Sequence, residues 1–72
     1  MTLAVAIANW SNVYRTVLSS CPVKPYNLEV AVQYGAMDML NMVKGMKEDA
    51  AIYMINDDAA YMNEKLAKEA QV

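Results

Sequence analysis

Apolar residues recur along this chain at helical spacing in three stretches, with polar residues between them. The spacing alternates mostly between three and four residues, which keeps the apolar side chains on one face of a helix that turns about 100° per residue. We therefore predict an all-α fold, a helical bundle or an assembly of extended helical hairpins. Its three short helices are expected near residues 2–20, 26–45 and 49–70, in a single domain over residues 1–72. The expected core residues are Leu3, Ile7, Trp10, Tyr14, Val17, Leu28, Val32, Met39, Met42, Val43, Met46, Ile52, Ile55, Met62 and Leu66.

The middle stretch carries a second apolar stripe roughly opposite the first, and the third stretch has a smaller one. An ordinary surface helix of a small domain has one apolar face and a polar back. We therefore predict that residues 28–46 form the central helix, with Gly35 either allowing close approach of a neighbour or marking a kink. The second stripe meets either another part of this chain or another molecule. The candidate partner interface is Val30, Tyr34, Met37, Met54 and Tyr61.

Capping and breaking residues set the expected helix ends. Thr2 and Asn27 precede the first two apolar patterns and are suitable N-caps. Pro22 and Pro25 interrupt the chain between these patterns, because neither can donate a backbone hydrogen bond inside a helix. Such a connection is typical of a link between antiparallel helices.

The apolar pattern changes phase after Gly45. On an unbroken helix the later stripe would face about 160° away from the earlier one, at about 100° per residue. One helix cannot bury both stripes against one core, so we predict a turn at residues 45–49 with Asp49 as N-cap. One long helix serving two neighbours, and a short strand at residues 52–55, remain alternatives.

Composition argues against several classes of function. The chain has 57% hydrophobic and 19% charged residues, which is typical of folded proteins rather than disordered ones. Its net charge is -2 and its six basic residues are scattered, so no nucleic-acid surface is expected. Cys21 is the only cysteine and histidine is absent, which excludes an internal disulfide and the usual zinc ligand sets.

No catalytic, cofactor-binding or metal site is expected. The commonest general base is missing with histidine, and Cys21 has only Lys24 nearby to activate a thiolate. The adjacent acidic pairs at positions 48–49 and 57–58 diverge on a helix rather than converge on one site. Seven methionines and five tyrosines are the unusual feature, and they serve either as core filler in place of phenylalanine or as contact surface for a partner.

The chain offers no expected membrane span, because its longest uncharged run, residues 1–14, is shorter than the roughly 20 apolar residues needed. No basic residue precedes Leu3, so no signal peptide is expected. Together with the lone cysteine this predicts a protein that is not secreted and lies in the cytoplasm or within a virion-like assembly.

These patterns predict a small non-enzymatic structural or interaction subunit. It would act by helix packing with copies of itself, as a homo-oligomer, or within a larger assembly, and its size would suit a phage or viral assembly component. A small regulator or inhibitor that masks a partner protein is the first alternative. An amphipathic membrane-surface protein is the second, although the polar side of the first helix carries only Arg15 as a basic residue.

Overall fold

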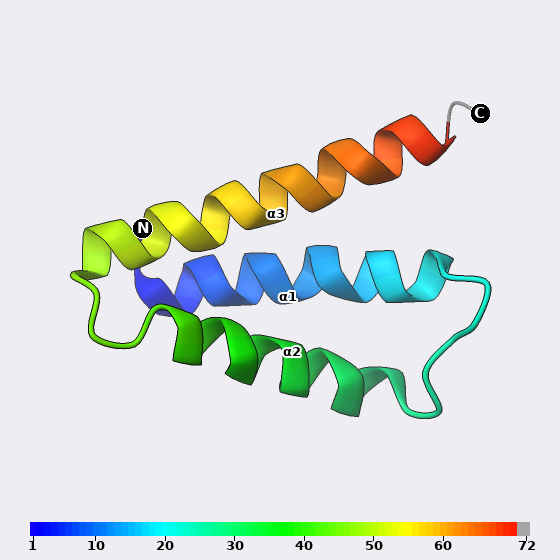
Figure 1. The fold of residues 1–72 in the computed structure, drawn as a ribbon, viewed down its shortest axis with the longest axis horizontal. Coiled ribbons are helices and arrows are strands. Elements are labelled where there is room, and N and C mark those ends of the chain that lie inside the picture. The colour runs from blue at the N-terminus through cyan, green and yellow to red at the C-terminus, as the bar shows by residue number, and fades with distance from the viewer. Residues whose placement is uncertain (71–72) are drawn as a thin grey trace.

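Three helices build the molecule in a computed structural model that describes residues 1–70 of the chain. They are α1 (Leu3–Ser20), α2 (Leu28–Met42) and α3 (Glu48–Ala70), and the described residues contain no strand. The chain runs up, down and up again, so α1 and α3 are parallel and α2 is antiparallel to both (Figure 1). The molecule measures 37 × 27 × 17 Å. The predicted all-α fold is confirmed.

The helix at the centre is α1, and the prediction that residues 28–46 form the central helix is wrong. α1 packs along both α2 and α3, whereas α2 and α3 contact each other little (Figure 1). The apolar arc of α1 is wide enough to meet two neighbours side by side. The second stripe of α2 faces solvent instead of a neighbouring helix.

The first two helices begin after capping residues that the sequence predicted. The side-chain oxygen of Thr2 accepts a hydrogen bond from the Val5 backbone N–H, and that of Asn27 accepts one from Val30. Each bond satisfies one of the backbone donors left free in a first helical turn. Because Asn27 is the cap, α2 begins at position 28 rather than at the predicted 26.

The connection between α2 and α3 is a tight turn, so the alternative of one long helix is wrong. Residues 52–55 lie inside α3, so the alternative of a short strand there is wrong as well. α2 ends at Met42, three residues before the predicted end. Gly45 has φ +87°, a left-handed conformation that glycine adopts without a steric penalty and that commonly follows a helix end. α3 begins at Glu48, so Asp49 lies in its first turn rather than at the N-cap, where its charge still favours the helix.

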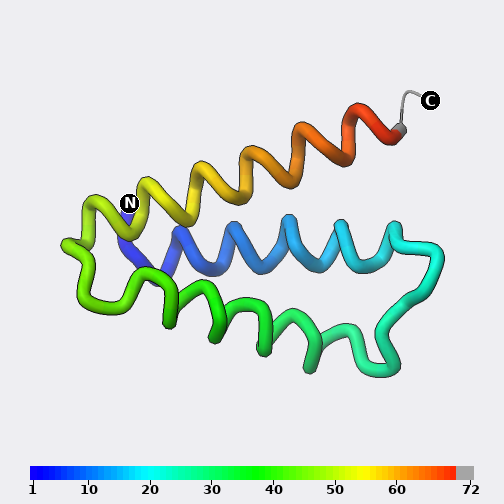
Figure 2. The backbone as a smooth tube through the Cα atoms, in the orientation of Figure 1, coloured from blue at the N-terminus to red at the C-terminus, as the bar shows by residue number. Residues whose placement is uncertain are grey.

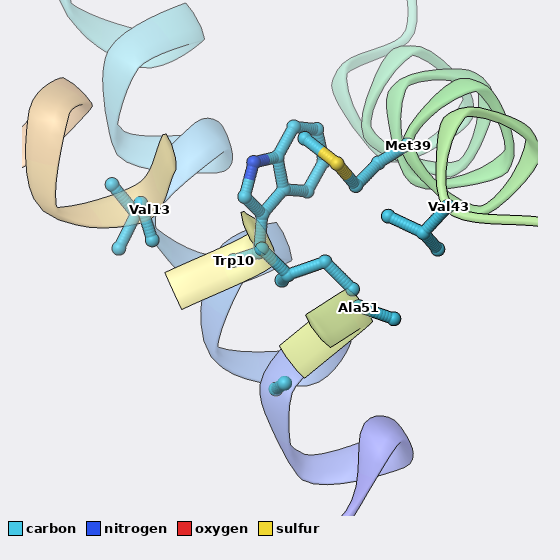
Figure 3. Packing of buried hydrophobic residues seen from close by; sticks show 8 residues of the cluster. Trp10, Val13, Met39, Val43 and Ala51 are labelled. Carbon is cyan, nitrogen blue, oxygen red and sulfur yellow. The ribbon is translucent and has the colours of Figure 1, made fainter. Parts of the chain in front are cut away.

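The buried core gathers at the end of the molecule where the α2–α3 turn meets the start of α1. Met39 and Val43 reach from α2 toward Trp10 (Figure 3). The buried hydrophobic residues are Ala6, Trp10, Val13, Val32, Met39, Val43, Ala51, Ile55 and Ala59, and all of them except Val32 belong to this cluster. Four of these, Ala6, Val13, Ala51 and Ala59, were not in the predicted core.

Small side chains explain why α3 leaves α1 along its length. Ala6 on α1 and Ala51 and Ala59 on α3 are buried between the helices and let their axes come close. Beyond them the larger Val17 and Met62 stand on the two helices and are only partly buried. The backbone trace shows the axis of α3 moving away from α1 toward its C-terminal end (Figure 2).

Two predicted core residues are exposed. Met42 is 60% exposed because it is the last residue of α2 and its side chain borders the gap between α2 and α3. Met46 is 41% exposed because the backbone has left the helical path by then, so the stripe of α2 no longer continues to it. The other predicted core residues are buried or partly buried.

Gly35 leaves room for aromatic side chains of α1 rather than for another backbone. A Cβ atom at this position would come within 2.9 Å of Tyr14 Cδ2 and 3.2 Å of Trp10 Cη2. The two rings are stacked on each other with their centroids 4.9 Å apart, so Tyr14 cannot move away without disturbing Trp10. Gly35 therefore lets the aromatic pair lie against α2.

Gly35→Ala should destabilise the fold by about 1–2 kcal/mol. Overpacking costs about 1–3 kcal/mol, and the better helix propensity of alanine returns up to about 1 kcal/mol of it. Urea unfolding followed by circular dichroism measures the difference. In a Tyr14→Leu background the same substitution should be neutral or stabilising, because the clashing ring is gone. An equal loss in both backgrounds would contradict the proposed clash.

An ion pair joins α1 to the first turn of α2. Arg15 Nε and Nη2 donate to the two carboxylate oxygens of Glu29 at 2.8 and 3.0 Å. The hydrogen bonds from Arg15 lower the pKa of Glu29, partial desolvation of the carboxylate opposes this, and the positive charge of Arg15 adds to the lowering. A lowered pKa in the folded state means that the pair contributes at neutral pH and is lost as the pH falls through that pKa. Both side chains are solvent-accessible, so this contribution is small.

Candidate functional site

The outward side of α2 carries large apolar side chains in water. We call this surface the outer face of α2, and its exposed apolar residues are Val30, Tyr34, Met37 and Leu40. Tyr34 is 64% and Met37 56% exposed. At about 100° per residue, only the uncharged Gln33 and Asn41 share this side of the helix. The outer face therefore holds no charged residue.

The charged residues of α2 lie on its flanks. Glu29 turns toward α1 and is paired with Arg15. Asp38 lies on the opposite flank and borders the gap between α2 and α3. An apolar helical surface without charges is typical of a contact with another protein, because charged residues are depleted at the centre of such contacts.

The five predicted interface residues do not form one surface. Val30, Tyr34 and Met37 lie together on the outer face of α2. Tyr61 is exposed on α3 and borders a separate hollow. The placement of Met54 in the interface is wrong, because its flexible side chain packs against the core cluster and is only partly exposed.

Leu40 belongs to the outer face of α2 but was not predicted. On a helical projection of α2, Leu40 falls between the two apolar stripes, so the sequence pattern placed it in neither of them. Only the packing of α1 against the opposite side of α2 shows that Leu40 faces water, at 39% exposed.

A trough runs along α1, opening between α2 and α3 at its Trp10 end and between α1 and the C-terminal half of α3 at its Cys21 end. Two hollows lie in it, of about 270 and about 410 Å³. Their floor is formed by Trp10 and Tyr14 in the first hollow and by Val17 and Cys21 in the second. These four residues are spaced by four, three and four positions, so they lie along one line of α1 beneath both hollows.

Carboxylates border the trough at its Trp10 end. Asp38 comes from α2 and Asp58 from α3, and both line the first hollow. The indole Nε1–H of Trp10 donates a hydrogen bond to Asp58 Oδ2 at 2.6 Å, which ties α1 to α3 across 48 residues of sequence. Neither carboxylate forms a salt bridge with the part of the chain that the structure describes.

The walls of the second hollow come from α3, and their charges are mixed. Met62 and Leu66 supply its apolar part, and Lys65 and Glu69 supply one charge of each sign. Cys21, on the floor, is a free thiol whose Sγ–H donates to the Val17 carbonyl oxygen at 3.3 Å. The acidic end of the trough is therefore the Trp10 end.

Comparison with known proteins finds no similar protein. No family model matches the chain, and no curated protein or solved structure matches it either. Within residues 1–70, none of the helices is both long and apolar enough to cross a membrane. The same residues contain no group of three or more acidic or cysteine side chains placed to hold a metal ion.

Proposed function

We propose that this protein is a non-enzymatic structural or interaction subunit that associates with copies of itself through the outer face of α2. The observation that carries the proposal is the group of four large apolar side chains on one exposed helical face without a charge among them. Burying one such side chain fully stabilises an association by about 1.5–3 kcal/mol. A fold of 72 residues also gains from added burial, because small domains bury too little surface to be very stable alone.

Self-association suits the outer face of α2 better than contact with a charged surface. In a symmetric dimer each residue meets the same patch of the partner, so a charged patch would repel itself. The outer face has no charge and avoids this cost. Two antiparallel copies of α2 would also oppose their helix dipoles favourably.

Three more specific roles can be compared for such a subunit. Copies that associate through a helix face would suit a component of phage or viral assembly, in the cytoplasm or within the particle. The role of a regulator that masks a partner protein is supported by the trough, because it is a second surface at which a partner could bind. A membrane-surface role has less support, because the outer face of α2 lacks the flanking lysines and arginines that bind lipid headgroups.

Tyr34→Asp should break the assembly while leaving the helices intact. The substitution places a charge in the middle of the outer face, where two copies would bring like charges together without water. Sedimentation should show a fall from oligomer to monomer, and circular dichroism should keep the helical signal. The matched control is Tyr53→Asp, since Tyr53 is also largely exposed, at 73%, but lies on α3. That variant should remain oligomeric.

Three results would count against the proposal. These are a parent protein that is monomeric at all concentrations, an oligomer that Tyr34→Asp leaves unchanged, and an oligomer that Tyr53→Asp dissociates to the same extent. Loss of helix in Tyr34→Asp would show that the outer face of α2 is needed for folding rather than for association.

A further inference from the structure

We propose that the trough along α1 binds an amphipathic helix of another protein, with lysine or arginine residues of that helix meeting Asp38 and Asp58 where the trough opens between α2 and α3. This inference is independent of self-association, because the trough and the outer face of α2 are different surfaces.

The form of the trough fits a helix. α2 and α3 both pack on α1 but hardly touch each other, which leaves the position that a fourth helix would take in a four-helix bundle. The floor residues Trp10, Tyr14, Val17 and Cys21 follow helical spacing, as the facing stripe of a packed helix would. Grooves of this kind bind the apolar face of amphipathic helices.

The charges of the trough select a basic ligand. Asp38 and Asp58 border the first hollow from opposite walls, and neither has a cationic partner within residues 1–69. A helix that lies over Trp10 and Tyr14 therefore has carboxylates on both sides. Lysine or arginine on its flanks would pair with them, whereas glutamate there would be repelled.

A second copy of this chain does not supply such a helix. The outer face of α2 is the exposed apolar helical surface, and it carries no basic residue. On α1, Arg15 is already paired with Glu29. On α3, Lys65 lines the second hollow of the trough itself, and Lys68 is paired with Glu64. The occupant is therefore a helix from a different protein.

Trp10 makes the test direct, because it is the only tryptophan of the chain and lies on the trough floor. The probe is a synthetic amphipathic helical peptide without tryptophan, with leucines on one face and lysines on both flanks. A second peptide carries glutamate in place of every lysine. We expect the lysine peptide to change the Trp10 emission in a saturable way, and the glutamate peptide to bind at least about ten-fold more weakly, a difference of about 1.4 kcal/mol.

Variants of Asp38 place the binding in the trough. Asp38 is exposed, so Asp38→Asn and Asp38→Lys should both fold. Asp38→Asn should weaken the lysine peptide by about two- to five-fold, the range of an exposed ion pair. Asp38→Lys should weaken it further and improve binding of the glutamate peptide. The control is Asp57→Lys, an equal charge change at an exposed position of α3 that does not line the trough.

Several outcomes would overturn the inference. These are no change in Trp10 emission at millimolar lysine peptide, equal affinity for the two peptides, and equal effects of Asp38→Lys and Asp57→Lys. Dissociation of the oligomer by the peptide would show that the trough is a contact between copies. Tyr34→Asp separates the two proposals, because the resulting monomer should bind the lysine peptide as the parent does.

Discussion

Trp10→Ala should destabilise the protein by about 3–5 kcal/mol, the usual cost of removing a large buried aromatic side chain. Trp10 is a residue of α1 that is only 5% exposed and has neighbours on all three helices. It stacks on Tyr14 of α1, lies against α2 at Gly35 and donates a hydrogen bond to Asp58 of α3. The substitution removes these contacts together, because they belong to one side chain.

The expected loss for Trp10→Ala is large relative to the free energy of unfolding of the whole protein. A chain of 72 residues has a free energy of unfolding of about 4–11 kcal/mol at ordinary stability per residue. We therefore expect Trp10→Ala to have a clearly lower melting temperature and a much lower urea midpoint at 10 °C. Circular dichroism measures both, since the variant has no tryptophan fluorescence.

Two companion variants test the reason. Trp10→Phe keeps an aromatic ring but removes the donor to Asp58, so it should lose part of the stability only. Tyr53→Ala removes an exposed aromatic ring of α3 and should change the free energy of unfolding by less than about 0.5 kcal/mol. A Trp10→Ala protein as stable as the parent would show that the indole does not hold the helices together.

Ile55→Ala should cost about 2–5 kcal/mol, the second large effect. Ile55 is 0% exposed and is the largest side chain buried completely. It lies in the core cluster among Ala51, Ala59 and Val43, where the surrounding small side chains have little freedom to fill the space it leaves. The cavity therefore adds to the lost transfer free energy.

Ile52 offers a matched control within the same helix. It is an isoleucine one turn earlier and is only partly buried at the edge of the cluster. Ile52→Ala should cost clearly less than Ile55→Ala in the same urea titration, because water already reaches part of the side chain. An equal or larger loss for Ile52→Ala would mean that the core lies on a different side of α3.

The three helices follow from local sequence. The apolar spacing, the caps at Thr2 and Asn27, the prolines between the first two helices and Gly45 after the second act over a few residues. Such signals need no knowledge of the rest of the fold, so the chain alone is enough to predict an all-α protein with three helices.

The choice of the central helix was decided by tertiary packing. The second stripe of α2 gave it two apolar faces, and periodicity alone cannot tell a face that meets a neighbour from one that meets water. In the structure α1 has both neighbours, since its alanine and aromatic positions allow α3 and α2 to approach on adjacent sides. The same packing left the stripe of Val30, Tyr34 and Met37 exposed.

The trough is the feature that the sequence could not show. Asp38 and Asp58 are 20 positions apart on different helices, and the helical spacing within each stretch relates neither of them to Trp10 or to the other. They face one hollow because α2 and α3 pack on adjacent sides of α1 without closing over it. Local sequence determined which residues form each helix, but the distance between two helices that do not touch depends on the side chains of the third helix between them.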